Sequence, residues 1–419
     1  MHTPIRRSAI FLSAVALLVA MGGANSGAAS AEARAAEDDV LKLGYVLPET
    51  GQLAFLGPPM IQSTNFAIKT INDAGGVLGN PIPKVVGADE AGQEAVASQS
   101  AARVLNAGVD AIVGAAASAM SLAFIDRVTG EGVVQCSGSN TAPTFTDYDD
   151  GGYYFRTAPS DALQGPVLAE TIQGDGHERV ALVARADDYG RGLLDATQKA
   201  LEAGGTTVTV AETYDPKATN FDQLIQRVEN SRPDATVVIA FEEGTQIIQG
   251  LIEAGIGPAQ RGVYGTDGLR SEELPGLVAP NDPGRIAGMK GTAPASETNE
   301  QFVNSLQDFA PNLNVLQFAP QTFDCVTTIA LAAEQAKTDD PREFVKEMIP
   351  VTKDGEKCNS FAQCKQLIAD GKNIDYDGVS GPLDFTDAGE PSQATIEVYE
   401  YTEEGELTTV RTEQTSVED

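Results

Sequence analysis

The sequence predicts an α/β fold in which parallel sheets carry helices on both faces. Short apolar runs typical of buried strands alternate with longer segments whose apolar residues recur at helical spacing. This alternation covers residues 41–157 and starts again over residues 163–265. Such alternation is typical of parallel sheets, and its repetition in a chain of 419 residues predicts two α/β lobes.

The first run is expected to hold five strands and three helices. One helix should begin at Pro58 and Pro59, because proline is tolerated in the first turn, and should end at Gly75 and Gly76. A second helix is expected at 91–107, and a third should begin at Ser118. The expected strands are 41–47, 84–88, 111–113, 133–134 and 153–157.

The second run repeats the pattern and is followed by a less regular part. Its expected helices are 163–172, 190–203, 221–228 and 245–254, and its expected strands are 180–183, 206–210, 235–240 and 262–265. Residues 286–292 are expected to form a connection. Helices should follow at 299–309, 321–336 and near 342–349, with strands at 380–385 and 396–401 that return to the second lobe.

The stretch from Val109 to Thr146 is the strongest candidate for a ligand site. It has a strand–helix–strand pattern, with Ser118 at the start of the helix and hydroxyl side chains up to Thr141 after the second strand. Ligands of open parallel sheets bind at the carboxyl ends of strands, and a helix start offers unpaired N–H groups to an anion. The alternative is that Ser118 only caps its helix.

The first 35 residues are expected to be a secretory signal peptide. Arg6 and Arg7 precede an apolar run over residues 9–21, which is too short to span a membrane. Two small-x-small sites fit cleavage, 29–31 and 33–35, and the second is preferred because acidic residues follow it. With no cysteine near the cleavage region, we expect an exported, soluble protein without a lipid anchor, in the periplasm or at the outer face of the envelope.

Charge and cysteine content restrict the partners and the covalent structure. The formal net charge of −32 disfavours binding to nucleic acid or to anionic lipid. In an oxidising compartment, Cys358 and Cys364 are expected to form a local disulfide within a loop. Cys136 and Cys325 are either a second disulfide or two buried thiols, and we favour the disulfide.

The residues offer little to an enzyme. After removal of the signal peptide the only histidine is His177, which lies in a polar turn, so a nucleophile–histidine pair is not expected. Zinc-ligand spacing and a phosphate-binding loop are both missing from the sequence. Residues 147–152 resemble the start of a calcium loop, but a solvated acidic turn fits them better. We therefore expect a binding protein with no cofactor and no metal.

Five segments carry a resemblance to one family. They are TINDAGGVLG at 70–79, GSNTAPTFT at 138–146, YFRTAPSDALQG at 154–165, DDYGRG at 187–192 and SGPLDF at 380–385. In this order, the chain from 41 to 402 resembles the leucine/isoleucine/valine-type solute-binding proteins of ABC importers.

The resemblance implies a periplasmic binding protein type 1 fold, in which two Rossmann-like lobes are joined by three crossings. The crossings would lie near 157–160, 291–294 and 384–390. The lobes would then comprise 36–158 with 293–385, and 159–292 with 386–419.

The resemblance also implies the roles of site residues. Ser118 and Thr141 would hold a ligand carboxylate, with Ala116 and Asn140 in the same turns. Asp267 would hold an ammonium from a Gly-x-acid-Gly turn in which the family more often has Glu, and the alternative is that it is a plain turn residue. The side chain of the ligand would meet residues that equally fit ordinary packing, namely Phe55, Leu56, Tyr189 and Phe241. Glu242 or Glu243, if either faces the cleft, would favour a basic or amide-bearing ligand.

The function expected from these observations is that of a monomeric receptor for a branched-chain or similar amino acid. It would deliver this ligand to a membrane permease of an ABC importer. Alternatives are a binding protein for amides, urea or another small polar solute, and a ligand-sensing domain. An exported hydrolase is less favoured, because the sequence lacks a nucleophile–base pair.

Overall fold

The computed structural model describes residues 38–296 and 299–417. The described residues belong to one compact unit, and all that follows concerns this unit. The expected signal peptide and both cleavage sites lie outside the described residues. Within the described part, no helix combines the length and the apolar character needed to cross a membrane.

The first sheet has five parallel strands in the order β2-β1-β3-β4-β5. Its strands are β1 (Leu43–Leu47), β2 (Val86–Asp89), β3 (Ala111–Gly114), β4 (Val134–Ser137) and β5 (Tyr154–Arg156). The helices associated with it are α1 (Gly57–Asp73), α2 (Glu94–Asn106), α3 (Ser118–Leu122), α4 (Ile125–Gly130), α10 (Glu300–Phe309) and α11 (Ala319–Ala336). The strands and the helices α1 and α2 follow the expected order of the first run, while the single helix expected from Ser118 is divided into α3 and α4. Helices α10 and α11 correspond to the later expected helices 299–309 and 321–336.

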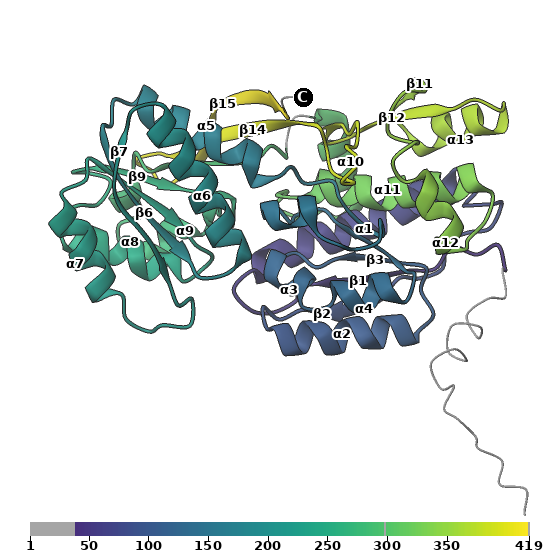
Figure 1. Cartoon of the computed structure of the whole chain (residues 1–419), viewed down its shortest axis with the longest axis horizontal. Coiled ribbons are helices and arrows are strands. Elements are labelled where there is room, and N and C mark those ends of the chain that lie inside the picture. The colour runs from purple at the N-terminus through teal and green to yellow at the C-terminus, as the bar shows by residue number, and fades with distance from the viewer. Residues whose placement is uncertain (1–37, 297–298, 418–419) are drawn as a thin grey trace, which may run out of the picture. The chain divides into compact units, whose positions relative to one another are not determined.

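Alternate residues of β3 explain why helices cover both faces of this sheet. Ala111 and Val113 are buried in one core together with residues of α1 and α11. Ile112 points the other way, into a core that includes residues of α2. Side chains of a strand alternate between the two faces, so an apolar run needs a helix layer on each. In Figure 1, α1 and α11 lie on one side of β1 and β3, and α2 lies on the other.

The second sheet has seven strands in the order β15-β14-β10-β9-β8-β6-β7. The strands β6 to β10 are parallel, while β14 and β15 are antiparallel. They are β6 (Arg179–Arg185), β7 (Thr207–Tyr214), β8 (Ala235–Ile239), β9 (Gly262–Gly265), β10 (Lys290–Pro294), β14 (Gln393–Tyr401) and β15 (Leu407–Ser416). Its helices are α5 (Asp161–Gly174), α6 (Asp188–Ala203), α7 (Asp222–Ser231), α8 (Gly244–Glu253) and α9 (Leu274–Val278).

The two sheets repeat one topology. The parallel part of the second sheet, β7-β6-β8-β9-β10, reproduces the order of the first when each is numbered from its own first strand. In such sheets the order reverses beside the first strand, and ligands bind outside the carboxyl ends of the strands there. The loops after β1, β3, β6 and β8 are therefore the expected ligand-binding loops.

The structure corrects three expectations about the second half of the chain. Residues 290–294 are strand β10, although a connection was expected there, and the chain leaves the second sheet only after Pro294. Strand β15 was not expected, because its threonine and charged residues are mostly exposed. Cys364 lies in helix α13 (Phe361–Ala369), which was expected to be part of a loop, and its neighbours β11 (Glu356–Cys358), β12 (Ile374–Gly378) and β13 (Gly381–Pro382) form a small third sheet.

The chain passes between the two large sheets three times. It goes from β5 through residues 157–160 into α5, and from β10 towards α10, whose Phe302 packs against Phe66 of α1 with ring centroids 6.2 Å apart. It returns through residues 383–392 to β14, which pairs with β10 from Pro294↔Ile396 onwards. Two of the three passages therefore start or end at neighbouring strands, β10 and β14, which are hydrogen-bonded to each other.

The four cysteines form two disulfides in the structure. Cys136 at the end of β4 pairs with Cys325 of α11, across a sequence separation of 189 residues. Cys358 pairs with Cys364 across a separation of 6 residues, which ties β11 to α13. The first pair thus fixes a strand of the first sheet to its longest covering helix.

The two disulfides should differ in their contribution to stability. Loop-closure entropy predicts a loss of about 5 kcal/mol in the free energy of unfolding for Cys136→Ala with Cys325→Ala, and about 2 kcal/mol for Cys358→Ala with Cys364→Ala. Denaturant unfolding of the two double variants measures this, after peptide mapping without reductant has established both pairs. Equal losses in the two variants would contradict the expectation.

Candidate functional site

A pocket lies where the ligand-binding loops of both sheets meet. It is lined by Leu53, Leu56, Ala116, Ala117, Ser118, Ser139, Thr141, Tyr189, Phe241, Asp267, Gly268 and Phe318. Its cavity measures about 10 Å³, which is room for about one water molecule. The walls therefore contact one another, and a larger ligand needs them to move apart.

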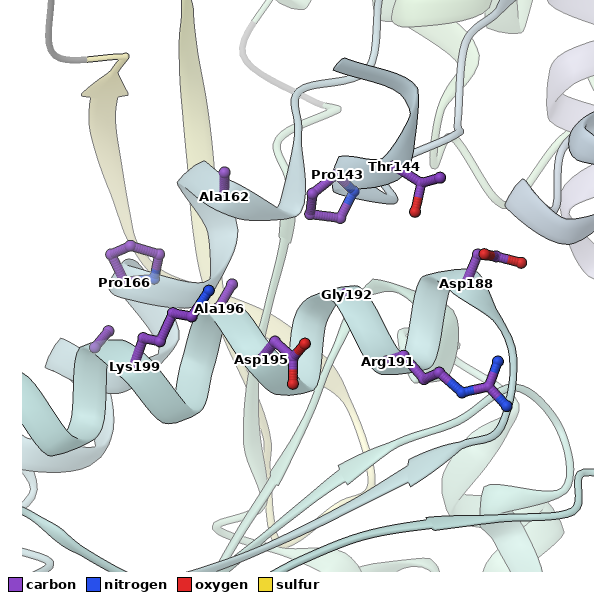
Figure 2. A pocket seen from close by; sticks show the side chains of 11 residues that line it. Pro143, Thr144, Ala162, Pro166, Asp188, Arg191, Gly192, Asp195, Ala196 and Lys199 are labelled. Carbon is purple, nitrogen blue, oxygen red and sulfur yellow. The ribbon is translucent and has the colours of Figure 1, made fainter. Parts of the chain in front are cut away.

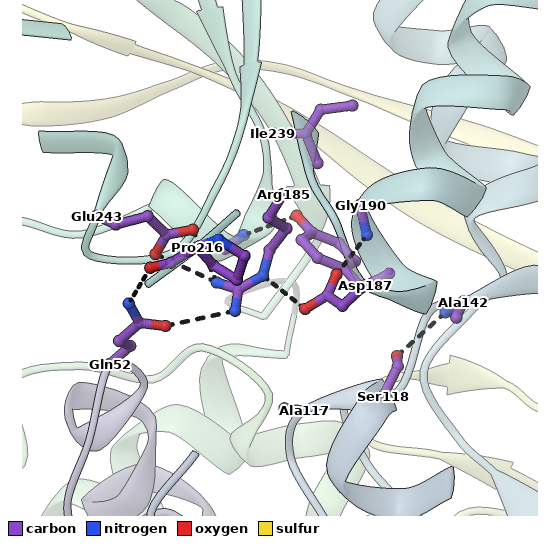
Figure 3. A network of polar contacts seen from close by, with 12 residues as sticks. Gln52, Ala117, Ser118, Ala142, Arg185, Asp187, Gly190, Pro216, Ile239 and Glu243 are labelled. Atoms are coloured by element: carbon purple, nitrogen blue, oxygen red, sulfur yellow. Dashed lines mark hydrogen bonds and ion pairs between the residues drawn. The ribbon is translucent and has the colours of Figure 1, made fainter. Parts of the chain in front are cut away.

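Hydroxyl groups form the wall on the side of the first sheet. Ser118 begins α3 after β3 and is 3% exposed, and its Oγ accepts a hydrogen bond from the backbone N–H of Ala142 at 3.4 Å (Figure 3). Ser139 donates from its hydroxyl to the carbonyl of Ala116 at 3.0 Å. Thr141 donates to Oδ2 of Asp161 at 2.9 Å. Short side chains at two strand ends thus converge on one spot.

A buried glutamate supports the first of these loops. The backbone N–H groups of Ala116 and Ala117 donate to the carboxyl of Glu90, at 2.7 and 3.3 Å. Burial raises the pKa of Glu90 to about 8. No local sequence signal indicates this role, because Glu90 directly follows β2 and is distant in the chain from the loop that it supports.

A buried arginine supports the second loop. Arg156 donates through Nη1 to the carbonyls of Asn140 and Ala142, at 3.3 and 2.8 Å, and so fixes the backbone on both sides of Thr141. Its Nε donates to Oε2 of Glu390 at 2.8 Å, within the third passage between the sheets. Arg156 is fully buried.

Two expected site residues do not line the pocket. The amide of Asn140 donates to the carbonyls of Ala115 and Ala116, at 3.1 and 2.8 Å, so its side chain holds the two loops together. Phe55 is half-buried in a short turn, and Leu53 and Leu56 on either side of it line the pocket in its place.

Asp267 is the central group on the side of the second sheet. It follows β9, and its Oδ1 accepts hydrogen bonds from Nε2 of Gln164 and from the hydroxyl of Tyr189, both at 2.8 Å. Its backbone carbonyl accepts from Nε2 of Gln317 at 2.7 Å. Burial raises the pKa of Asp267 to about 6.

Asp161 is a second buried carboxyl group that the sequence did not single out. It is the first residue of α5, it is fully buried, and its backbone N–H donates to the carbonyl of Thr141 at 2.7 Å. Burial raises the pKa of Asp161 well above its usual value, and the charge of Asp267 raises it further. The one available signal was its position directly after the expected crossing at 157–160.

Several oxygen atoms near Asp267 have no hydrogen-bond partner among the described residues. They are Oδ1 of Asp161, Oε1 of Gln164 and Oε1 of Gln317. A buried acceptor without a donor costs free energy, and a ligand or a water molecule can supply that donor. The geometry therefore suits a ligand group with several N–H donors and a positive charge.

An aromatic stack closes another side of the pocket. The rings of Tyr189 and Phe241 lie 5.3 Å apart and nearly parallel, and the guanidinium of Arg185 lies over Phe241, 3.5 Å from the ring centroid. Arg185 also forms ion pairs with Asp187 at 2.6 Å and with Glu243 at 3.0 Å (Figure 3).

These contacts decide the question of the two glutamates after β8. Glu243 is buried and paired with Arg185, while Glu242 is exposed. Neither lines the pocket. The remaining lining is apolar around Leu53, Leu56 and Phe318, so the far end of the pocket suits an aliphatic group.

Direct hydrogen bonds connect the two sides over the pocket. Gln52, after β1, donates to the carbonyl of Pro216 at 3.4 Å and accepts from Nη2 of Arg185 at 3.3 Å (Figure 3). Thr141 and Gln317 add their contacts with Asp161 and Asp267. Among the described residues, no group of three or more His, Cys, Asp or Glu side chains is placed to hold a metal ion.

Comparison with known proteins agrees with this architecture. Leu/Ile/Val-binding protein homolog 3 of Brucella melitensis is 23% identical over 392 residues, which cover 93% of this chain and 96% of the relative. The branched-chain amino acid transporter substrate binding protein LivJ of Streptococcus pneumoniae, solved with isoleucine, has a TM-score of 0.73 at 21% identity and covers 90% of this chain and 100% of its own.

A solved ABC transporter solute binding protein from R. palustris, in complex with 4-hydroxybenzoate, is equally similar in fold. Its TM-score is 0.74 at 17% identity, with coverage of 90% of this chain and 97% of its own. A family model described as periplasmic binding protein matches residues 40–406. Since this match spans most of the sequence, the chain belongs to the periplasmic binding protein family.

Proposed function

We propose that this protein captures a zwitterionic amino acid with an aliphatic side chain, as the extracytoplasmic receptor of an ABC importer. The observation that carries the proposal is that the hydroxyls of Ser118 and Thr141 line one pocket with the buried carboxyl group of Asp267, while a second buried carboxyl group, Asp161, is hydrogen-bonded to Thr141. Members of the family are substrate-binding receptors, which agrees with a role without chemistry.

Each part of the ligand has a matching part of the wall. The carboxylate would meet Ser118 and the Thr141 hydroxyl, which would turn from Asp161 to the ligand. The ammonium would donate to Asp267 in the lining and to the unpaired Oδ1 of Asp161 beside it. The aliphatic group would lie against Leu56 and Phe241. A ligand of this kind supplies the N–H donors that the buried acceptors lack.

An aromatic acid is the second candidate, because a structural relative holds 4-hydroxybenzoate. A benzoate-like ligand has a carboxylate but no cation, so it would leave Asp161 and Asp267 buried without a counter-charge. Amides and urea supply N–H donors but no charge. The two carboxyl groups therefore favour an amino acid over each of these classes.

We further propose that the two large sheets, with their helices, are lobes that separate to admit the ligand and close on it. The small cavity and the hydrogen bonds across it support a closed arrangement. The joining segments would be 157–160, the chain after Pro294, and 383–392. Export by the N-terminal segment, a monomeric state and delivery to a permease belong to the same proposal, in keeping with the periplasmic location of the family.

A thermal-shift screen tests the ligand class. The screen should include the twenty amino acids, urea, simple amides, benzoate and 4-hydroxybenzoate. A branched-chain amino acid should raise the midpoint most, since a ligand at one hundred times its Kd adds about 2.7 kcal/mol of stability. A larger shift with benzoate than with any amino acid would contradict the proposal.

Variants of the two opposite walls should differ in their effect on affinity. Asp267→Asn keeps the shape but leaves the ammonium without a counter-charge, so affinity should fall by about 30-fold or more. Ser118→Ala should cost less, about 1–3 kcal/mol, because other donors remain beside the carboxylate. Calorimetry with the best amino acid of the screen measures both.

Asp126→Asn serves as a matched control, because Asp126 is an exposed carboxylate that bonds Tyr148 and lies outside the pocket lining. Its affinity should equal that of the parent. Binding by Asp267→Asn within twofold of the parent would place the ammonium site elsewhere.

Affinity should also depend on pH with a definite sign. Because burial raises the pKa of Asp267 to about 6, acidification through this value protonates the carboxylate that the ammonium needs. Affinity should therefore fall by up to about tenfold per pH unit below pH 6. Calorimetry from about pH 7.5 to about pH 5 measures this, and Asp267→Asn should flatten the profile.

The stability of the ligand-free protein should change in the opposite direction. A carboxyl group whose pKa is higher in the folded than in the unfolded protein holds its proton more tightly when folded. Its contribution to the free energy of unfolding is therefore lost as the pH rises through about 6. Near neutral pH, Asp267→Asn should accordingly raise the ligand-free midpoint while it weakens binding. An affinity independent of pH in the parent would count against a charged Asp267 at the ligand.

A further inference from the structure

Helix α6 approaches the first-sheet side of the pocket very closely at one glycine. Tyr189 in its first turn lines the pocket, and Gly192 follows three residues later on the same face. Opposite Gly192 lies Pro143, two residues after Thr141 (Figure 2). A Cβ atom at position 192 would lie 2.5 Å from Cδ and 3.4 Å from Cγ of Pro143.

The helix itself gives no reason for a glycine at this position. Gly192 lies inside a 16-residue helix and is absent from the glycines of the described chain that have a positive φ. Glycine is the least favourable residue of a helix interior apart from proline. The requirement therefore comes from the neighbour, and Pro143 is a rigid ring that cannot rotate away.

The contact joins segments that belong to different sheets. Pro143 begins a short turn, Pro143–Asp147, after β4 of the first sheet, whereas α6 follows β6 of the second. Around the contact lies an open groove of about 700 Å³, flanked by Asp188, Arg191, Asp195 and Lys199 (Figure 2). The side chains of these four residues border open space. At Gly192, in contrast, there is no room for a side chain.

We infer that Gly192 is a positioning residue for ligand binding, because its missing side chain sets how closely α6 and Pro143 approach when the pocket closes. The inference rests on the proposed function. A wedge between α6 and Pro143 would hold Tyr189 and the bonded Asp267 away from Thr141 on the first-sheet side, without touching the ligand.

Gly192→Ala and Gly192→Val provide graded wedges of one and three carbon atoms. Overpacking of this size should weaken binding by roughly 5- to 150-fold, with the larger effect for valine. The ligand-free midpoint of Gly192→Ala should stay equal or rise, since alanine is the better helix former. Opposite changes in affinity and stability separate positioning from general damage.

Two further variants complete the experiment. Pro143→Ala in the Gly192→Ala background removes the clash and should restore most of the lost affinity, as a double-mutant cycle measures. Gly174→Ala is the matched control, because Gly174 is the last residue of α5, another helix of the second sheet, and a Cβ there would meet nothing within 4 Å. Its affinity should equal that of the parent.

The solute used is the one with the largest shift in the thermal screen, whatever its class. If that solute is not an amino acid, the proposed ligand class fails, while the Gly192 series still reports on closure. Parent-like binding by both Gly192 variants would overturn the inference. A parallel fall of affinity and ligand-free midpoint, or no restoration by Pro143→Ala, would overturn it as well.

Discussion

The main physical constraint on the site is the burial of two acidic groups at the meeting point of the two sheets. Asp161 and Asp267 are both buried, and each raises the cost of ionising the other. Neutral donors from Thr141, Gln164 and Tyr189 offset part of this cost, and none of the described residues that line the pocket is a cation. Under the proposed function, a cationic group of the ligand would remove this electrostatic cost, and recognition and closure would draw on the same free energy.

The loop that carries Thr141 is rigid because an ion pair supports it from behind. Arg156 satisfies two loop carbonyls and pairs with Glu390, and both side chains are buried. A buried pair of this kind is costly to break, because either partner alone would be left charged in a low-dielectric interior. Since Glu390 lies in a passage between the sheets, the loop and the passage keep a fixed relation. The arginine therefore connects the position of the hydroxyl to the position of the chain between the sheets.

The sequence was sufficient to predict the class of fold, because the pattern of apolar residues in a strand or helix reflects which of its faces are buried. The alternation in β3, Ala111 to Gly114, and the family segments led to the right fold class. Strand β10 was missed because Gly291 and Pro294 are poor strand residues, and only its pairing with β9 and β14 makes it a strand.

For the site, local sequence identified groups at strand ends but not their partners. Ser118, Thr141 and Asp267 all line one pocket, because strand ends of parallel sheets converge. Asp161, Glu90 and Arg156 owe their roles to contacts with residues that are distant in sequence or packed from the other side. No periodicity or turn signal records contacts of this kind.

The pairing of β10 with β14 has a mechanical consequence. Two of the three passages emerge side by side from these antiparallel strands, and the ladder continues as far as the bond from the N–H of Ala295 to the carbonyl of Thr395. A two-stranded ribbon flexes readily across its thin dimension, but sliding one strand past the other breaks its hydrogen bonds. Such a joint therefore bends easily in only one direction. Opening and closing would then follow a single arc, and the two binding walls would meet in the same register at every cycle.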